Sequence, residues 1–254
     1  MSDDLFDDEH LKALNAADQD QVDRLQASAQ IAATRTFGPF NDVPDSPFHT
    51  AEDLSPMETW EQIAERVVLA TAVAAIHGTA QRDISVEAIC RLHEIIFQTT
   101  FPEHAGHLRR RGEEARYGIV LGTTEQPIVK SERATAGARL PRRLQQLCDE
   151  FNSATADQDQ LDAIRLDDLV FIAVRLYTKM LSAHPFLDGN GRTAFTILQY
   201  ALARGDLPCV ALENFEAHQR SLGMALRSDG RQSYAPLQAL IVAKLNEARI
   251  LDDD

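Results

Sequence analysis

The stretch LDDLVFIAVRLYTKMLSAHPFLDGNGRTAFTILQYALA, residues 166–203, carries the clearest structural signal in the chain. Its first half is apolar around most of a helical circumference, which predicts a buried central helix over Leu166–Ala183. Pro185 disfavours helical geometry at the residue before it, so this helix is expected to end near His184. A second helix should follow the glycine-containing turn and run to Ala203.

The turn between these two helices contains residues suited to binding phosphate. Gly189 and Gly191 flank Asn190 close to the point where the second helix should begin, and glycines permit bends that point successive amides into one concavity. The helix N-terminus adds unpaired amides and a partial positive charge, so an anion-binding nest is predicted. Arg192, in the first helical turn, can bind phosphate oxygens with its guanidinium.

Two more side chains of this turn can supply a metal ligand and a base. Asp188 is the one carboxylate nearby, and Mg²⁺ prefers one or two carboxylates together with phosphate oxygens and water. His184 has a side chain whose ordinary pKa suits the removal of a hydroxyl proton near neutral pH. Together with the phosphate nest, these residues predict a phosphoryl- or nucleotidyl-transfer site.

The rest of the chain is predicted to be all-α with one small β-hairpin. Helical periodicity recurs in segments 60–77, 85–97, 140–151, 215–227 and 234–248. In contrast, residues 116–129 place β-type side chains on either side of a Gly-Thr-Thr turn, which predicts the hairpin. We expect an acidic helical arm with a proline-containing connection over residues 1–58, and one helical domain over residues 59–254.

Composition and charge exclude several classes of protein. The chain of 254 residues is 44% hydrophobic, contains no membrane-length apolar run, and begins without a signal-peptide pattern, so a cytoplasmic protein is expected, with secretion as an effector left open. Its net charge of -14 discourages binding to nucleic acid. Residues 109–143 are an exception, with nine basic and four acidic side chains, and could face a phosphate-rich small molecule. Three widely spaced cysteines predict buried free thiols.

The turn resembles the motif H-x-F-x-(D/E)-G-N-G-R of the Fic family at every defined position. The matching residues are His184, Phe186, Asp188, Gly189, Asn190, Gly191 and Arg192. Upstream, HAGHLR at residues 104–109 resembles the family's (W)AG-x-x-R segment, and the hairpin occupies the place of its target-docking flap. The resemblance covers about residues 60–248 and implies the Fic-type helical bundle.

This resemblance also implies transfer of AMP from ATP to a Ser, Thr or Tyr hydroxyl of a target protein, with release of pyrophosphate. His184 would deprotonate the hydroxyl, Asp188 would hold Mg²⁺ against the phosphates, and the GNGR segment would cradle them. Arg109 is a candidate nucleotide contact, with a solvated side chain as the alternative. The flap would bind target backbone by strand addition through residues Gly118, Ile119, Val120, Leu121 and Gly122.

Two departures from the family pattern leave alternatives open. Where Fic enzymes usually carry a second arginine, this chain has Phe195, which is similar to the apolar continuation of the related Doc kinases. A Doc-like kinase, a transferase of another nucleotide, and a binding module without turnover are therefore alternatives. The inhibitory motif (S/T)-x-x-x-E-(G/N) is matched only in part, by Thr99 and Glu103. Either an antitoxin or other inhibitory partner supplies restraint, or the protein is controlled otherwise. The N-terminal arm is a candidate contact for such a partner or for self-association.

Overall fold

The computed structural model describes residues 19–37, 56–80, 83–110, 113, 137–156, 166–212, 215–227 and 231–252. The regular secondary structure within these ranges is helical, which confirms the all-α class. They contain α2 (Gln19–Phe37), α3 (Pro56–Thr79), α4 (Val86–Phe97), the short 3₁₀-helix η2 (Gly137–Arg139), α6 (Leu140–Ala154), α8 (Leu166–Ala183), α9 (Asn190–Ala203), α10 (Phe215–Arg227) and α11 (Arg231–Asp252). The predicted hairpin at residues 116–129 lies outside the described ranges.

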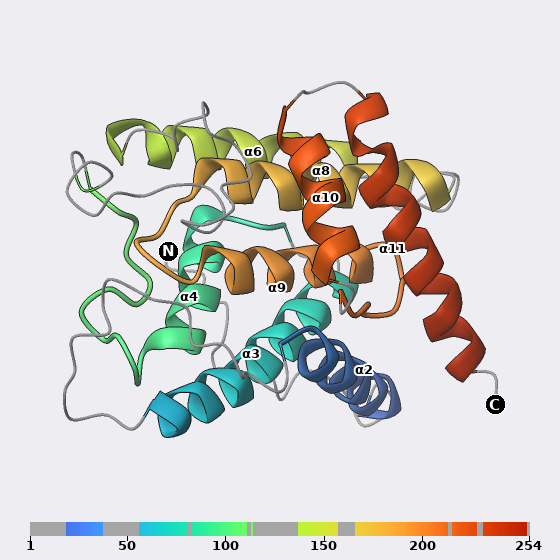
Figure 1. Cartoon of the computed structure of the whole chain (residues 1–254), viewed down its shortest axis with the longest axis horizontal. Helices are drawn as coiled ribbons and strands as arrows, with labels where there is room; N and C mark the ends of the chain where they lie inside the picture. The colour runs from blue at the N-terminus through green and yellow to red at the C-terminus, as the bar shows by residue number, and fades with distance from the viewer. Residues whose placement is uncertain are drawn as a thin grey trace.

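Helix α9 runs through the middle of the bundle, with α8 and α6 on one side and α3 on the other (Figure 1). Every residue from Thr193 to Ala203 is buried, and none of them is charged. A helix that is covered on all faces must be apolar all round, which is the pattern seen in the sequence. This burial fixes α9, and therefore also fixes its N-terminal end, where the candidate site lies.

The helix boundaries follow local sequence signals. Ser85 adopts extended geometry and its hydroxyl accepts a hydrogen bond from the Ala88 amide at 3.1 Å, as expected for an N-cap. Helix α8 ends before Pro185, as predicted. Helix α11 starts at Arg231, earlier than the predicted start at residue 234. The helix begins earlier because contacts hold its first turn, which precedes Pro236. Arg231 is paired with Asp168 of α8 in this turn.

Helix α2 belongs to the same core as the rest of the bundle. It packs along α3, and Ala29, Ala32 and Ala33 on its inner face are fully buried in the common core (Figure 1). At its end, Phe37 packs edge-on against the ring of Phe195 in α9, with 5.0 Å between ring centroids. The expected division of the chain at residue 58 stays a prediction.

Other expectations concern the membrane and the cysteines. Among the helices described, none has the length and apolar character that crossing a membrane requires. Cys90, Cys148 and Cys209 are free thiols, and burial raises the pKa of each to about 12. They are therefore protonated at neutral pH; Cys148 and Cys209 are buried as expected, whereas Cys90 is only partly buried.

Candidate active site

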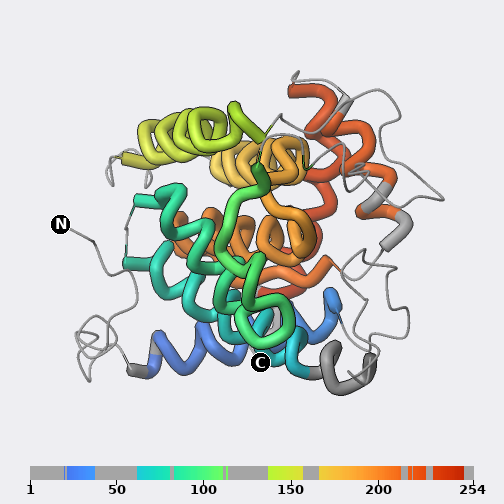
Figure 2. The backbone as a smooth tube through the Cα atoms, turned by 90° about the vertical axis from the view of Figure 1, so that its left-hand side faces the viewer, coloured from blue at the N-terminus to red at the C-terminus, as the bar shows by residue number. Residues whose placement is uncertain are grey.

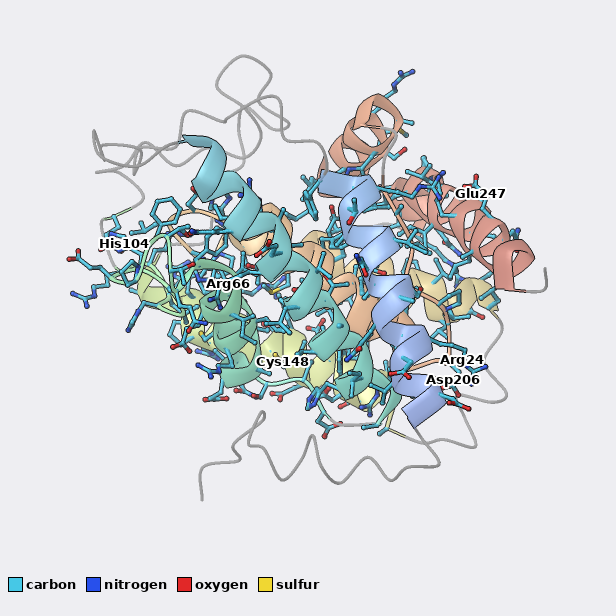
Figure 3. All side chains as sticks on the ribbon, turned by 90° about the horizontal axis from the view of Figure 1, so that it is seen from below. Arg24, Arg66, His104, Cys148, Asp206 and Glu247 are labelled. Carbon is cyan, nitrogen blue, oxygen red and sulfur yellow. The ribbon has the colours of Figure 1, made fainter. Side chains whose placement is uncertain are left out.

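The candidate site lies at one end of the bundle, where two segments meet. Figure 2 views this end and shows residues 98–110 passing beside the turn that joins α8 to α9. Figure 3 places His104, from the first of these segments, at the opposite end of the molecule from Glu247 of α11. The amide of Arg109 donates to the Pro185 carbonyl at 2.9 Å, which joins the two segments directly.

His184 sits at the C-terminal end of α8 in a left-handed conformation. Its φ of 49° is unfavourable for a residue with a side chain, and its amide donates to the Met180 carbonyl at 3.1 Å, which extends the α8 hydrogen-bond pattern by one residue. Burial, together with the positive charge of Arg109, lowers the pKa of His184 to about 4. The imidazole is therefore uncharged at neutral pH and can accept a proton.

Arg109 is a buried cation that holds the end of α8. Its side chain is 2% exposed; Nε donates to the carbonyl of His184 at 2.5 Å, and Nη2 donates to that of Ala183 at 3.2 Å. The last carbonyls of a helix lack partners within the helix and carry partial negative charge, so a guanidinium stabilises this position. Arg109 thus positions the backbone of His184, while its suggested contact with nucleotide stays a prediction.

Asn190 closes the turn from within. Its Oδ1 accepts from the Phe186 amide and its Nδ2 donates to the Phe186 carbonyl, both at 2.9 Å. The side chain is 6% exposed, and the Phe186 ring is fully buried beneath the turn. These two hydrogen bonds tie the start of α9 to Phe186 and fix the backbone of the turn.

The two glycines of the turn serve different purposes. Gly189 has a φ of 72°, and a Cβ atom there would lie 2.1 Å from the Phe97 ring, so the fold itself requires glycine. At Gly191 a Cβ atom would meet nothing within 4 Å among the residues that the structure describes. Neither packing nor a left-handed backbone explains that second glycine, and glycine costs stability within a helix. The open space above Gly191, at the positive end of α9, suits an anion.

Arg192 follows in the first turn of α9, above the Phe97 ring that also lies against Gly189. Its guanidinium carbon lies 6.0 Å from the centre of the Phe97 ring. Burial lowers the pKa of Arg192 and the nearby Asp188 carboxylate opposes this effect, although a guanidinium remains charged at neutral pH. The amide and hydroxyl of Thr193 both donate to the Gly189 carbonyl at 3.0 Å and hold the start of the helix.

Asp188 provides the carboxylate of the site. Its Oδ1 accepts a hydrogen bond from the Gly189 amide at 2.6 Å. Within the described ranges no group of three or more His, Cys, Asp or Glu side chains could hold a metal ion by itself. A single carboxylate does fit Mg²⁺ that is bound mainly through the phosphates of a nucleotide and through water. Asp188 would hold the ion in such a complex.

Two residues of α4, His93 and Phe97, support the turn although the sequence did not indicate this role. His93 stacks on the Phe186 ring, and Phe97 underlies both Gly189 and Arg192. Ile89 and Phe97 lie on the buried face of this helix. A histidine four residues after Ile89, on that same face, was the available signal for His93. The flap residues Gly118 to Gly122 lie outside the described residues.

The geometry first defines a class: a helical domain in which an uncharged imidazole at the end of one buried helix is followed by a glycine-containing turn at the start of the next. Comparison with known proteins then shows what the chain is similar to. Residues 83–202 match the model of the Fic/DOC family. This match, which covers just under half of the chain, and the structural neighbours described next support a Fic domain protein.

One curated relative and two solved structures illustrate the similarity. A protein adenylyltransferase from Bartonella henselae is 26% identical over 106 residues, which span 41% of this chain and only 19% of the relative. A Fic domain containing signaling protein from Bacteroides thetaiotaomicron superposes with a TM-score of 0.65 at 16% identity, covering 93% of this chain and 89% of that one. A fragment of Fic-1 from C. elegans gives 0.56 at 18% identity, covering 94% and 66%.

Proposed function

We propose that this protein transfers AMP from ATP to a hydroxyl group of a target protein. The observation that carries the proposal is the open space above Gly191, which lies at the positive end of α9 and one residue before Arg192. The name of the Bartonella henselae relative, protein adenylyltransferase, supports the same reaction. Transferase chemistry of the AMPylation type also agrees with the family.

In the proposed reaction the amides at the start of α9 and the Arg192 guanidinium bind the phosphates of ATP. Asp188 would hold Mg²⁺, which supplies positive charge to the phosphates when it is bound. His184 takes the proton of the target hydroxyl as the oxygen forms a bond to the α-phosphorus. The bond between the α- and β-phosphates breaks, and pyrophosphate leaves.

The low pKa of His184 in the protein alone is compatible with the role of a base. The imidazole is uncharged before the reaction, because burial and Arg109 disfavour the protonated form. The phosphates of a bound nucleotide would bring negative charge close to the ring and raise its pKa. Proton transfer from the hydroxyl would thus become easier in the complex than in the free protein.

The direct test is incubation of the purified protein with Mg²⁺, a cell lysate and ATP labelled at either the α- or the γ-phosphate. We expect protein-bound label from the α-phosphate, and none when His184→Ala replaces the native chain. Absence of protein-bound α-label under all conditions would refute AMP transfer. UTP, GTP and CDP-choline, tested in the same way, would identify a different donor.

A second candidate, a Doc-like protein kinase, is favoured by one residue. Phe195 stands where a second arginine would extend the phosphate site, and it is 1% exposed and packed under Phe37. This position cannot contact a phosphate, so the third phosphate of ATP loses one possible charged partner. Label arriving from the γ-phosphate and not from the α-phosphate would establish the kinase reaction.

A further inference from the structure

Helix α4 carries a buried histidine, His93, that contacts both segments of the site. Its Nδ1 lies 2.9 Å from the amide nitrogen of Gly106, and its Nε2 lies 3.1 Å from the carbonyl oxygen of Asp188. Because an amide N–H can only donate, Nδ1 is the acceptor, so Nε2 bears the hydrogen and donates to Asp188. One imidazole therefore joins the turn after α4 to the turn before α9.

Packing holds this ring in one orientation. The imidazole lies on the Phe186 ring at 3.8 Å between centroids, with an angle of 14° between the planes. The Phe97 ring is tilted against it at 4.7 Å, and His93 is 3% exposed. A ring confined in this way cannot rotate toward Gly106 or Asp188 without breaking its hydrogen bond to the other residue.

The two turns that His93 joins also lie against α4 at glycines with left-handed backbones. A Cβ atom at Gly106, where φ is 73°, would lie 3.1 Å from Cβ of Glu94. A Cβ atom at Gly189 would lie 2.1 Å from the Phe97 ring. Each turn is thus placed by direct contact with α4, and His93 adds a hydrogen bond to each.

We propose that His93 is a positioning residue for the transfer reaction, an inference that rests on the proposed function. Through Asp188 it sets the orientation of the phosphate-binding turn, and through Gly106 it sets the path of the chain to Arg109, which holds the carbonyl of His184. One side chain outside the motif would thereby align the donor with the base.

Three substitutions of His93 test its hydrogen bonds to Gly106 and Asp188 separately. His93→Asn keeps an acceptor near Gly106 and loses the donor to Asp188. His93→Gln reaches Asp188 with its amide and loses the acceptor near Gly106. His93→Phe keeps the stacking on Phe186 and loses both hydrogen bonds.

Steady-state kinetics should distinguish these variants. We expect His93→Asn to raise the KM for the nucleotide about three- to tenfold at nearly unchanged kcat, the range for one lost hydrogen bond. His93→Gln should lower kcat by a similar factor at nearly unchanged KM, and His93→Phe should do both. His218→Gln, which alters a buried histidine of α10 bonded to Tyr177, is the control and should change neither constant. Equal kinetic losses in the Asn and Gln variants would overturn the proposal.

Hydrogen exchange of the protein without nucleotide tests the inference independently of activity. The amides of residues 188–190 should exchange faster in His93→Asn and His93→Phe, and at the native rate in His93→Gln. Unchanged exchange in His93→Asn would contradict the proposed role. If the native chain transfers no group from any nucleotide, the proposed function fails, and the exchange comparison still decides whether His93 positions the turn.

Discussion

At the scale of single residues, the site combines conformations that cost stability with side chains that serve the proposed reaction. His184 is left-handed although it is not glycine, and it is held there by Arg109. A left-handed residue with a side chain costs about 1–2 kcal/mol, which the contacts around it must offset. Strain that persists at a candidate catalytic residue is typical of functional sites.

Replacing this histidine should separate stability from activity. Asparagine tolerates left-handed geometry better than most residues, so His184→Asn should unfold at the same or a higher urea concentration. It cannot act as a base, and transfer of α-label from ATP should fall about 10²- to 10⁴-fold. A variant that unfolds normally and keeps more than a tenth of the activity would exclude His184 as the base.

The two glycines of the turn make a matched pair for a second prediction. Gly189→Ala should lower the free energy of unfolding by about 2–4 kcal/mol, because the new methyl group strains the backbone and collides with Phe97. Gly191→Ala should leave that free energy unchanged or raise it by up to about 1 kcal/mol, because alanine favours a helix.

The effect of Gly191→Ala on ATP binding should be large although its effect on stability is small. If the space above Gly191 holds phosphate, Gly191→Ala should raise the KM for ATP at least tenfold although the protein is fully folded. Urea unfolding and ATP titration of both variants measure the two effects. A Gly191→Ala protein with native affinity for ATP would show that phosphate binds elsewhere.

At the scale of elements, sequence periodicity predicted α8, α9 and α10 closely because their apolar faces, prolines and glycines are local signals. The residues of the motif were likewise visible in the sequence. The role of Arg109 inside the fold was not, because its partners His184 and Ala183 are distant in sequence. The same reason applies to His93, whose partners lie on two separate turns. Contacts of this kind depend on how helices pack, which periodicity does not report.

A second point at the scale of elements is a prediction about how α2 packs against α9. Phe37 ends α2 and packs against Phe195, next to the start of α9. Phe37→Ala should lower the free energy of unfolding by about 2 kcal/mol, since a half-buried aromatic contact is lost. Ile31→Ala on the same helix is the control, because Ile31 is 53% exposed and its loss should have little effect. Equal results in urea for the two variants would contradict the packing of α2 on α9.

At the scale of the whole molecule, buried histidines link stability to pH. Burial is the main cause that lowers the pKa of His93, His184 and His218 to about 4 each, whereas the ordinary value is 6.5. Between these values the unfolded chain binds protons that the folded chain does not. The stabilisation is therefore fully present above pH 6.5 and decreases as pH falls toward 4.

This dependence can be measured by urea unfolding at several pH values. Each histidine should contribute a loss of about 1.4 kcal/mol per pH unit within the window. His218→Gln keeps a polar partner for Tyr177 without a titrating group, so its slope against pH should be shallower than that of the native chain. An identical slope would mean that His218 is protonated in the folded protein.

The proposed function requires that the turn between α8 and α9 bind the phosphates of a nucleotide beside the His184 imidazole. A crystal structure of the protein with Mg²⁺ and a non-hydrolysable ATP analogue tests it most directly. We predict phosphates above Gly191, within hydrogen-bond distance of the first amides of α9, with the imidazole facing the α-phosphorus. Nucleotide bound elsewhere, or the imidazole turned into the apolar core, would contradict the account.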